Sequence, residues 1–180
     1  LGGARCALGE ATGGIMLLHG TTWESKHWPR ACWRDLARQL TETGYEVVLT
    51  SGNARERERA EFIVRDLPEA RLLPQMPLAD VMREMSLCDG VVSVDSGLGH
   101  LAVAMDIPVI GIYGASNATL TGMYGGRGIT LATRHLPCAP CLRKECQFLS
   151  LPNRTTIFPP CYEQITPQRV ASTLIGVLTR

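Results

Sequence analysis

The sequence predicts an α/β protein built on a doubly wound parallel sheet. Several of its short apolar runs are continuous rather than alternating, which is typical of strands buried on both faces. Helical patterns separate most of these runs, so strand and helix alternate along the chain and the crossovers are expected to be right-handed. The 180 residues, 45% of them hydrophobic, are enough for one well-packed domain but few for two.

The first half of the chain contains three expected strands and two expected helices. The apolar run "IMLLHG" (15–20) is interpreted as a strand, and a helix over 29–43 follows it, opened by a proline. The run "EVVLTSG" (46–52) is the second strand. The charged stretch 55–65 fits a helix whose solvated face carries ion pairs four residues apart. The short run 71–74 is the third strand.

The second half continues the alternation. An apolar run ends in the turn Asp95-Ser96-Gly97, and helical spacing resumes directly after it. Near the end of the chain, Thr166 and Pro167 are typical of a helix cap and a first helical position. The expected elements are a helix over 78–87, a strand over 90–95, a helix over 98–105, strands over 109–114 and 128–133, and a last helix over 167–178.

Polar and glycine-containing segments follow four of the predicted strands. In a doubly wound sheet the ligand crevice lies beyond the carboxyl ends of the strands. The sequence therefore predicts that residues 19–26, 51–56, 95–100 and 113–117 converge on one site.

The turn after the fourth strand has the features of an anion site. A helix that begins near Gly97 presents unpaired amides and the positive end of its dipole, which suit a phosphate. Gly97 and Gly99 would let a ligand approach the backbone. Ser96 adds a hydroxyl donor, and His100 can point its imidazole at the same anion. Asp95 would repel a diphosphate, so it would cap amides or accept hydrogen bonds from sugar hydroxyls.

The loops after the first two strands add complementary groups. Thr21 and Thr22 offer hydroxyls and backbone amides, and Lys26 offers a cation for phosphate oxygens. Gly52 permits close approach of a ligand. Glu56 is placed like an acidic residue that accepts hydrogen bonds from ribose hydroxyls.

Ordinary structural roles are open to the same side chains. Asp95 or Ser96 can be a simple helix cap, and His100 can be a half-exposed structural residue. Lys26 can be a solvated cation, and Glu56 can be surface charge. The chain has no GxGxxG after a strand and no Walker loop, which disfavours a nicotinamide-dinucleotide site or an ATP-hydrolysis site.

Charge and hydropathy exclude further classes of protein. The 18 basic and 17 acidic residues give a net charge of +1, so no global field favours nucleic acid or an anionic membrane. No apolar run approaches the roughly 20 residues that span a bilayer, and no signal-peptide core is present, so we expect a cytoplasmic location. Residues 1–14 begin without Met and are rich in Gly and Ala, and are interpreted as a linker remnant before a domain over 15–180.

Three segments together resemble the inverting heptosyltransferases that build the lipopolysaccharide inner core, in particular the heptosyltransferase I type. They are "HGTTWESKHWP", "LLPQMPLADV" and "SVDSGLGHLAVAMDIPVIGIYG", in the order of the family's carboxyl-terminal half, and they cover about residues 15–125. The resemblance implies a GT-B architecture of two facing Rossmann-like domains. This chain would be the second domain, which binds ADP-L-glycero-β-D-manno-heptose.

The same resemblance implies roles for individual residues. Lys26, Asp95 and His100 would be the catalytic side chains, with Asp95 in contact with the heptose. Met76 would border the adenine, together with the backbone around Gly52. The implied donor-binding set is Thr21, Thr22, Lys26, Gly52, Glu56, Met76, Asp95, Ser96, Gly97, Leu98 and His100.

The resemblance further implies transfer of heptose, with inversion, to a Kdo sugar of lipid A at the cytoplasmic face of the inner membrane, with peripheral membrane association. Lys26, His100 and a helix amino end can stabilise the departing ADP without a metal. The general base would come from an amino-terminal domain, so these 180 residues are expected to bind the donor without useful turnover. A stand-alone nucleotide-binding or partner-binding module, and a GT-B transferase for another nucleotide sugar, stay open as alternatives.

The segment over 136–166, here called the cysteine segment, is irregular and rich in Pro and Cys. Its spacing includes a CxxC pair and two further thiols, which can close a tetrahedral zinc site. Zinc is not favoured, because the second pair is not a CxxC and the segment is expected away from the predicted site. Free structural thiols are favoured over zinc, and a disulfide is the third alternative. The four cysteines are Cys138, Cys141, Cys146 and Cys161.

Overall fold

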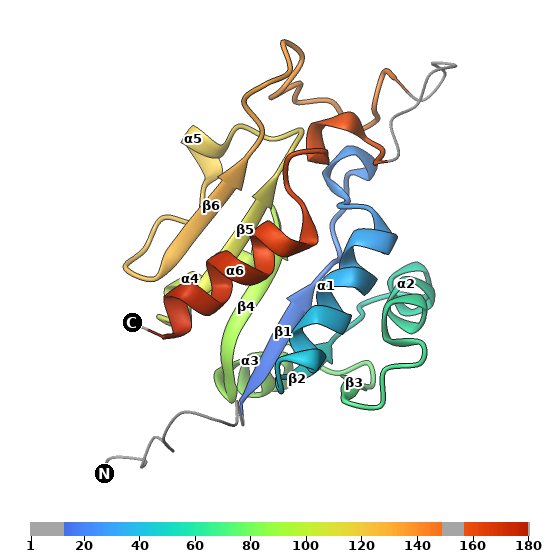
Figure 1. The fold of residues 1–180 in the computed structure, drawn as a ribbon, viewed down its shortest axis with the longest axis vertical. Coiled ribbons are helices and arrows are strands. Elements are labelled where there is room, and N and C mark those ends of the chain that lie inside the picture. Colours follow the sequence, from blue (N-terminus) through green and yellow to red (C-terminus); the bar gives the residue numbers. More distant parts are fainter. Residues whose placement is uncertain (1–12, 149–156, 180) are drawn as a thin grey trace.

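A computed structural model describes residues 13–148 and 157–179 of the chain. Its centre is an all-parallel sheet of six strands in the order β3-β2-β1-β4-β5-β6 (Figure 1). The predicted doubly wound α/β fold is therefore confirmed. The predicted linker remnant, 1–14, lies outside the described residues except at its last two positions, and Gly14 already belongs to the first strand.

All six predicted strands are present. Each ends one to three residues earlier than predicted, because its last residues already belong to a loop at the carboxyl edge of the sheet. The strands are β1 (Gly14–Leu18), β2 (Glu46–Leu49), β3 (Ala70–Leu72), β4 (Cys88–Val94), β5 (Val109–Tyr113) and β6 (Gly128–Ala132).

The five predicted helices are also present, and Thr166 caps the last of them by accepting a hydrogen bond from the Arg169 amide at 3.2 Å. They are α1 (Arg30–Glu42), α2 (Ala54–Val64), α3 (Leu78–Ser86), α4 (Gly97–Ala104) and α6 (Pro167–Leu178). Three single turns were not predicted, since elements this short carry no apolar periodicity. They are α5 (Ala118–Thr121) and the 3₁₀ turns η1 (Glu24–Lys26) and η2 (Pro160–Tyr162).

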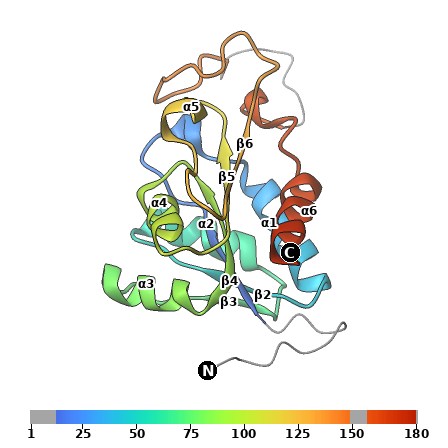
Figure 2. The same cartoon turned by 90° about the vertical axis from the view of Figure 1, so that its left-hand side faces the viewer.

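The helices form two layers around the sheet, with α1, α2 and α6 on one face and α3 and α4 on the other (Figure 2). Alternate residues of β1 point to the two layers. Ile15 and Leu17 join the apolar cluster under α1, α2 and α6, whereas Met16 and Leu18 join the cluster under α3 and α4. Within the described ranges, no helix combines the length and apolarity that crossing a membrane requires.

The strand order places the candidate site. From β1 the chain proceeds through β2 to β3 at one edge, and from β4 it proceeds through β5 to β6 at the other. The direction of winding therefore reverses between β1 and β4. In doubly wound folds ligands bind outside the carboxyl ends of the strands at such a switch point. The loop after β1, and the turn and helix start after β4, flank it and hold most of the predicted site residues.

Candidate functional site

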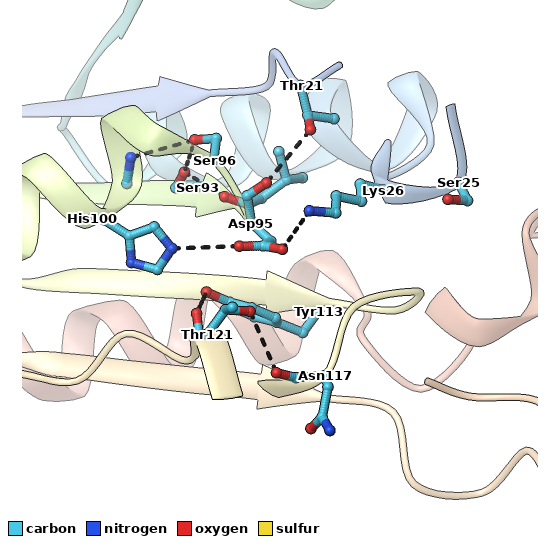
Figure 3. Close-up of polar contacts among 12 residues, drawn as sticks. Thr21, Ser25, Lys26, Ser93, Asp95, Ser96, His100, Tyr113, Asn117 and Thr121 are labelled. Atoms are coloured by element: carbon cyan, nitrogen blue, oxygen red, sulfur yellow. Dashed lines mark hydrogen bonds and ion pairs between the residues drawn. The ribbon is translucent and has the colours of Figure 1, made fainter. Parts of the chain in front are cut away.

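Asp95, the first residue after β4, is the centre of a polar cluster (Figure 3). Only 8% of its side chain is exposed, and its Oδ2 accepts a hydrogen bond from Nζ of Lys26 at 2.6 Å. Its Oδ1 lies 3.4 Å from Nε2 of His100, and its backbone oxygen accepts a hydrogen bond from the Thr21 hydroxyl at 3.4 Å. The structure thus brings together four predicted site residues from the β1 loop, the end of β4 and α4.

The charge of this cluster is fixed by its contacts. Burial by itself would raise the pKa of Asp95, but the hydrogen bonds and charge of its partners, above all Lys26, outweigh burial and lower that pKa. Asp95 is therefore ionised at neutral pH. The Lys26 ammonium lies 4.4 Å from the centroid of the Trp23 ring, and 18% of the side chain is exposed. The Lys26 side chain is therefore fixed by its ion pair with Asp95 and its contact with Trp23, and the solvated-cation alternative is wrong.

The first turn of α4 shows what Ser96 does. Its Oγ accepts a hydrogen bond from the Gly99 amide at 3.3 Å, so Ser96 is the helix cap, as one sequence interpretation proposed. The Ser93 hydroxyl donates to the Val94 carbonyl at 2.7 Å. Ser96 is therefore the donor in the 3.1 Å hydrogen bond between the two serine hydroxyls. In this structure the Ser96 hydroxyl therefore accepts a hydrogen bond from Gly99 and donates one to Ser93.

The two glycines of this turn have different environments. Gly97 is exposed, and a Cβ added to it would meet no atom within 4 Å. A Cβ on Gly99 would lie 2.5 Å from Ser93 Oγ and 2.8 Å from Met123 Cε. The prediction that Gly99 lets a ligand approach is therefore wrong, because packing inside the protein requires its missing side chain. Gly97 keeps open space above the start of the helix.

A cavity of about 240 Å³ lies beside this turn and contains other predicted residues. The Glu56 carboxylate accepts a hydrogen bond from the Gly52 amide at 2.7 Å, and a Cβ on Gly20 would lie 2.8 Å from it. The Glu56 side chain therefore contacts the loops after β1 and β2 and does not lie on the outer face of α2. The surface-charge alternative is wrong. The lining residues are Leu18, His19, Gly20, Thr50, Ser51, Gly52, Glu56, Met76, Leu78, Val81 and Leu98.

Three other residues of the first loop have distinct environments. Thr22 is exposed and, among the described residues, has no hydrogen bond to the Asp95 cluster. His19 is 1% exposed and packs edge-on against Trp33, with ring centroids 6.5 Å apart. Burial lowers the pKa of His19 to about 4. Burial, followed by the charge of Arg59, also lowers the pKa of His27. Both histidines are therefore neutral at pH 7, consistent with a structural role.

The cysteine segment was expected away from the site, and this is wrong. The Ser25 amide, next to Lys26, donates a hydrogen bond to the Lys144 carbonyl at 3.0 Å, and the Leu142 amide donates to the Ala115 carbonyl at 2.9 Å. Residues 142–144 of the segment therefore lie at the carboxyl edge of the sheet. These contacts join residues far apart in sequence through an aperiodic segment, so no local pattern could have indicated them.

The four cysteines of this segment line one small cavity, and their thiols are free. Burial raises the pKa of Cys161 to about 12. Within residues 13–148 and 157–179, no three His, Cys, Asp or Glu side chains are placed so that they could hold a metal ion. The zinc arrangement considered from the spacing is thus not present in the described structure.

Comparison with known sequences places the chain in a family. The sequence profile of glycosyltransferase family 9 (heptosyltransferase) matches residues 4–151. Lipopolysaccharide heptosyltransferase 1 of Pseudomonas aeruginosa is 41% identical over 170 residues, which are 91% of this chain and 48% of that protein. The enzyme of the same name from Escherichia coli K12 is 40% identical over 110 residues, 61% of this chain and 34% of that protein. The chain spans about half the length of the Pseudomonas relative.

Comparison with solved structures gives the same family as the sequence comparison. Escherichia coli heptosyltransferase WaaC with ADP superposes with a TM-score of 0.66 at 36% identity, over 69% of this chain and 39% of that one. Escherichia coli ADP-heptose lipopolysaccharide heptosyltransferase II superposes with a TM-score of 0.74 at 25% identity, over 93% of this chain and 46% of that one. Sequence and fold lead to one assignment: the chain belongs to glycosyltransferase family 9, the heptosyltransferase family.

Proposed function

We propose that residues 15–180 are the donor-binding domain of an inverting transferase that moves heptose from ADP-heptose to a Kdo residue of the lipopolysaccharide inner core. The observation that carries this proposal is the cluster in which buried Asp95 holds Lys26 and His100 beside the open start of α4. The ligands of a relative support it, because WaaC was solved with ADP and with ADP-2-deoxy-2-fluoro heptose.

In this proposal the donor diphosphate lies against Lys26 and His100. An ammonium group has three N–H donors, and Asp95 takes one, so Lys26 keeps two for phosphate oxygens. His100 is exposed, with 43% of its side chain accessible, and contacts the other carboxylate oxygen, so Lys26 and His100 flank Asp95 (Figure 3). Thr21 and Thr22 add hydroxyls and amides from the β1 loop.

The start of α4 supplies further donors. The first amides of a helix have no partner within it, and Ser96 satisfies only that of Gly99. The amides of Gly97 and Leu98 precede it and are the ones we assign to the diphosphate. The missing Cβ of Gly97 leaves room for phosphate oxygens there.

The adenosine is assigned to the cavity beside α4. Glu56 lies over Gly52 at its rim, where a carboxylate can accept hydrogen bonds from the two ribose hydroxyls. Met76 and Leu98 provide apolar contact for the adenine. The cavity thus combines apolar side chains with one carboxylate, a lining that suits a nucleoside.

The reaction would break the bond between C1 of the heptose and the phosphate oxygen while the acceptor hydroxyl forms a new bond to C1 from the opposite face. Lys26, His100 and the α4 amides would stabilise the negative charge that develops on ADP. Asp95 would contact the heptose. The acceptor proton needs a base, and neither of the two carboxylates assigned to the donor is free for it: Asp95 is paired with Lys26, and Glu56 holds the Gly52 amide.

We therefore assign the base, and most of the contacts to the acceptor, to the half of the relatives that this chain does not match. Transfer of the heptose to lipid A–Kdo would take place at the cytoplasmic face of the inner membrane, and the enzyme would associate with that membrane peripherally. In that setting the 180 residues supply the donor site and the groups that stabilise the leaving ADP.

Calorimetry of the chain with ADP-heptose, ADP and UDP tests the proposal. We expect ADP to bind more tightly than UDP, and the heptose to add affinity. Equal or absent binding of all three ligands would reject the donor site and favour a partner-binding module. Binding of ADP without any gain from the heptose would favour a transferase for another adenosine-diphosphate sugar.

A further inference from the structure

Ser25, the residue before Lys26, is held by residues more than 100 positions away in sequence. It is 3% exposed. Its amide donates a hydrogen bond to the Lys144 carbonyl at 3.0 Å, and its hydroxyl donates to the Arg143 carbonyl. Its own carbonyl accepts a hydrogen bond from Oη of Tyr162 at 3.1 Å. Every polar group of Ser25 is therefore tied to the cysteine segment.

Tyr162 is itself fixed in place. It is 0% exposed, and its ring crosses the end of β5 at Gly114. A Cβ on Gly114 would lie 2.7 Å from two ring carbons of Tyr162 and from Sγ of Cys161. The absence of a side chain at Gly114 thus lets the phenol reach the β1 loop.

The cysteine segment is anchored to the domain independently of Ser25. The Thr133 hydroxyl donates to the Cys161 carbonyl, and the Trp28 indole donates to the Ile165 carbonyl at 3.0 Å. The Leu142 amide donates to the Ala115 carbonyl at 2.9 Å. The described parts of the segment, residues 136–148 and 157–166, can therefore support the loop that they touch.

We propose that the cysteine segment positions Lys26 for the donor diphosphate, with Tyr162 as the positioning residue. This inference rests on the proposed function. Lys26 ends η1, a three-residue turn that has little stability of its own. Asp95 holds the Lys26 side chain, and Tyr162, through Ser25, holds its backbone. Loss of the Tyr162 hydroxyl leaves a buried carbonyl without a partner, and a shift of η1 that relieves this moves the ammonium away from Asp95.

A double-mutant cycle on ADP affinity tests the inference. Tyr162→Phe should weaken ADP binding roughly three- to tenfold, the effect of about one lost hydrogen bond. The same substitution should have almost no effect in a Lys26→Ala background, because it acts through Lys26. Thr43→Val is the control: it deletes a hydroxyl that donates to the Leu40 carbonyl at 2.8 Å, at the end of α1 and outside the cysteine segment, and it should leave ADP affinity within twofold. Equal effects of Tyr162→Phe in both backgrounds would overturn the inference.

A second readout needs no nucleotide. The chain has two lysines, Lys26 and Lys144. Mass spectrometry can therefore follow acetylation of each one. Tyr162→Phe, or Ser25→Ala if the first variant does not fold, should speed acetylation of Lys26 several-fold and leave exposed Lys144 unchanged. An unchanged Lys26 rate refutes the positioning role. Failure of the wild-type chain to bind ADP would instead refute the proposed function, and the acetylation result would still decide the positioning role.

Discussion

At the scale of single residues, the site depends on the pairing of Asp95 with Lys26. A buried carboxylate is unfavourable unless it is paired, and Lys26 supplies both the charge and a 2.6 Å hydrogen bond. Sequence reasoning selected both residues but left solvated or capping roles open for them. Only the contact between two loops that lie 69 positions apart decides between those roles.

The two lysines allow a direct test of the Lys26 assignment. Lys26→Ala should weaken ADP binding by on the order of 1.5–3 kcal/mol, because a charge-assisted contact to phosphate is lost. Lys144→Ala, which removes an exposed side chain and keeps the backbone carbonyl that Ser25 uses, should change the affinity little. Calorimetry of both variants checks this. Unchanged affinity in Lys26→Ala would mean that the diphosphate lies elsewhere.

His19 predicts how stability depends on pH. Burial, with a smaller contribution from the charge of Arg59, lowers its pKa from 6.5 to about 4. Between these values the unfolded chain binds the proton and the folded chain does not. Stability should therefore fall as the pH falls from 6.5 towards 4, with a contribution from His19 of up to about 3 kcal/mol.

Urea unfolding at several pH values measures this loss, and an NMR titration assigns it. The His19 ring resonances should titrate near pH 4 in the folded protein. A midpoint near 6.5 would contradict the burial argument.

At the scale of elements, sequence patterns located every strand, and every helix longer than one turn, that the described residues contain. Continuous apolar runs and helical spacing are local signals, so they were sufficient. The same signals could not place residues 136–148, which have no periodicity and are held by hydrogen bonds to Ser25 and Ala115. Nor could they distinguish Gly97 from Gly99, since only Gly99 faces Ser93 and Met123.

Two variants at the start of α4 distinguish a glycine that is needed for packing from a glycine that we assign to ligand binding. Gly99→Ala should lower the free energy of unfolding by about 1–3 kcal/mol, because its Cβ would overlap Ser93 and Met123. Gly97→Ala should leave stability nearly unchanged, since the space above Gly97 is open. It should nevertheless weaken ADP binding, because its methyl group would lie where we place the phosphate oxygens.

Denaturant unfolding and calorimetry of the two variants, side by side, provide the comparison. If Gly97→Ala bound ADP as tightly as the wild type, the diphosphate would not lie over the start of α4.

At the scale of the whole molecule, the strand order determines which loops can meet. The reversal between β1 and β4 places the Lys26 loop beside the Asp95 turn. The alternation of strands and helices predicted a parallel sheet and a shared carboxyl edge. It did not predict which strands are neighbours, because that order depends on packing between distant parts of the chain. The site was therefore predictable as a set of loops, whereas their contacts were not.

The proposed location of the base outside this chain gives the last prediction. Asp95 and Glu56, the two carboxylates assigned to the donor, are committed to Lys26 and Gly52, and we assign the base outside this chain. The 180 residues should therefore bind ADP-heptose and release almost no ADP when a Kdo–lipid A acceptor is added. Joining this chain to the part of the Pseudomonas relative that it does not match should restore acceptor-dependent release, and Lys26→Ala in that chimera should abolish most of it. Coupled detection of ADP measures both. Rapid, acceptor-dependent release by the 180 residues alone would show that the base lies within this domain, and one of its own carboxylates would then have to leave its present partner during the reaction.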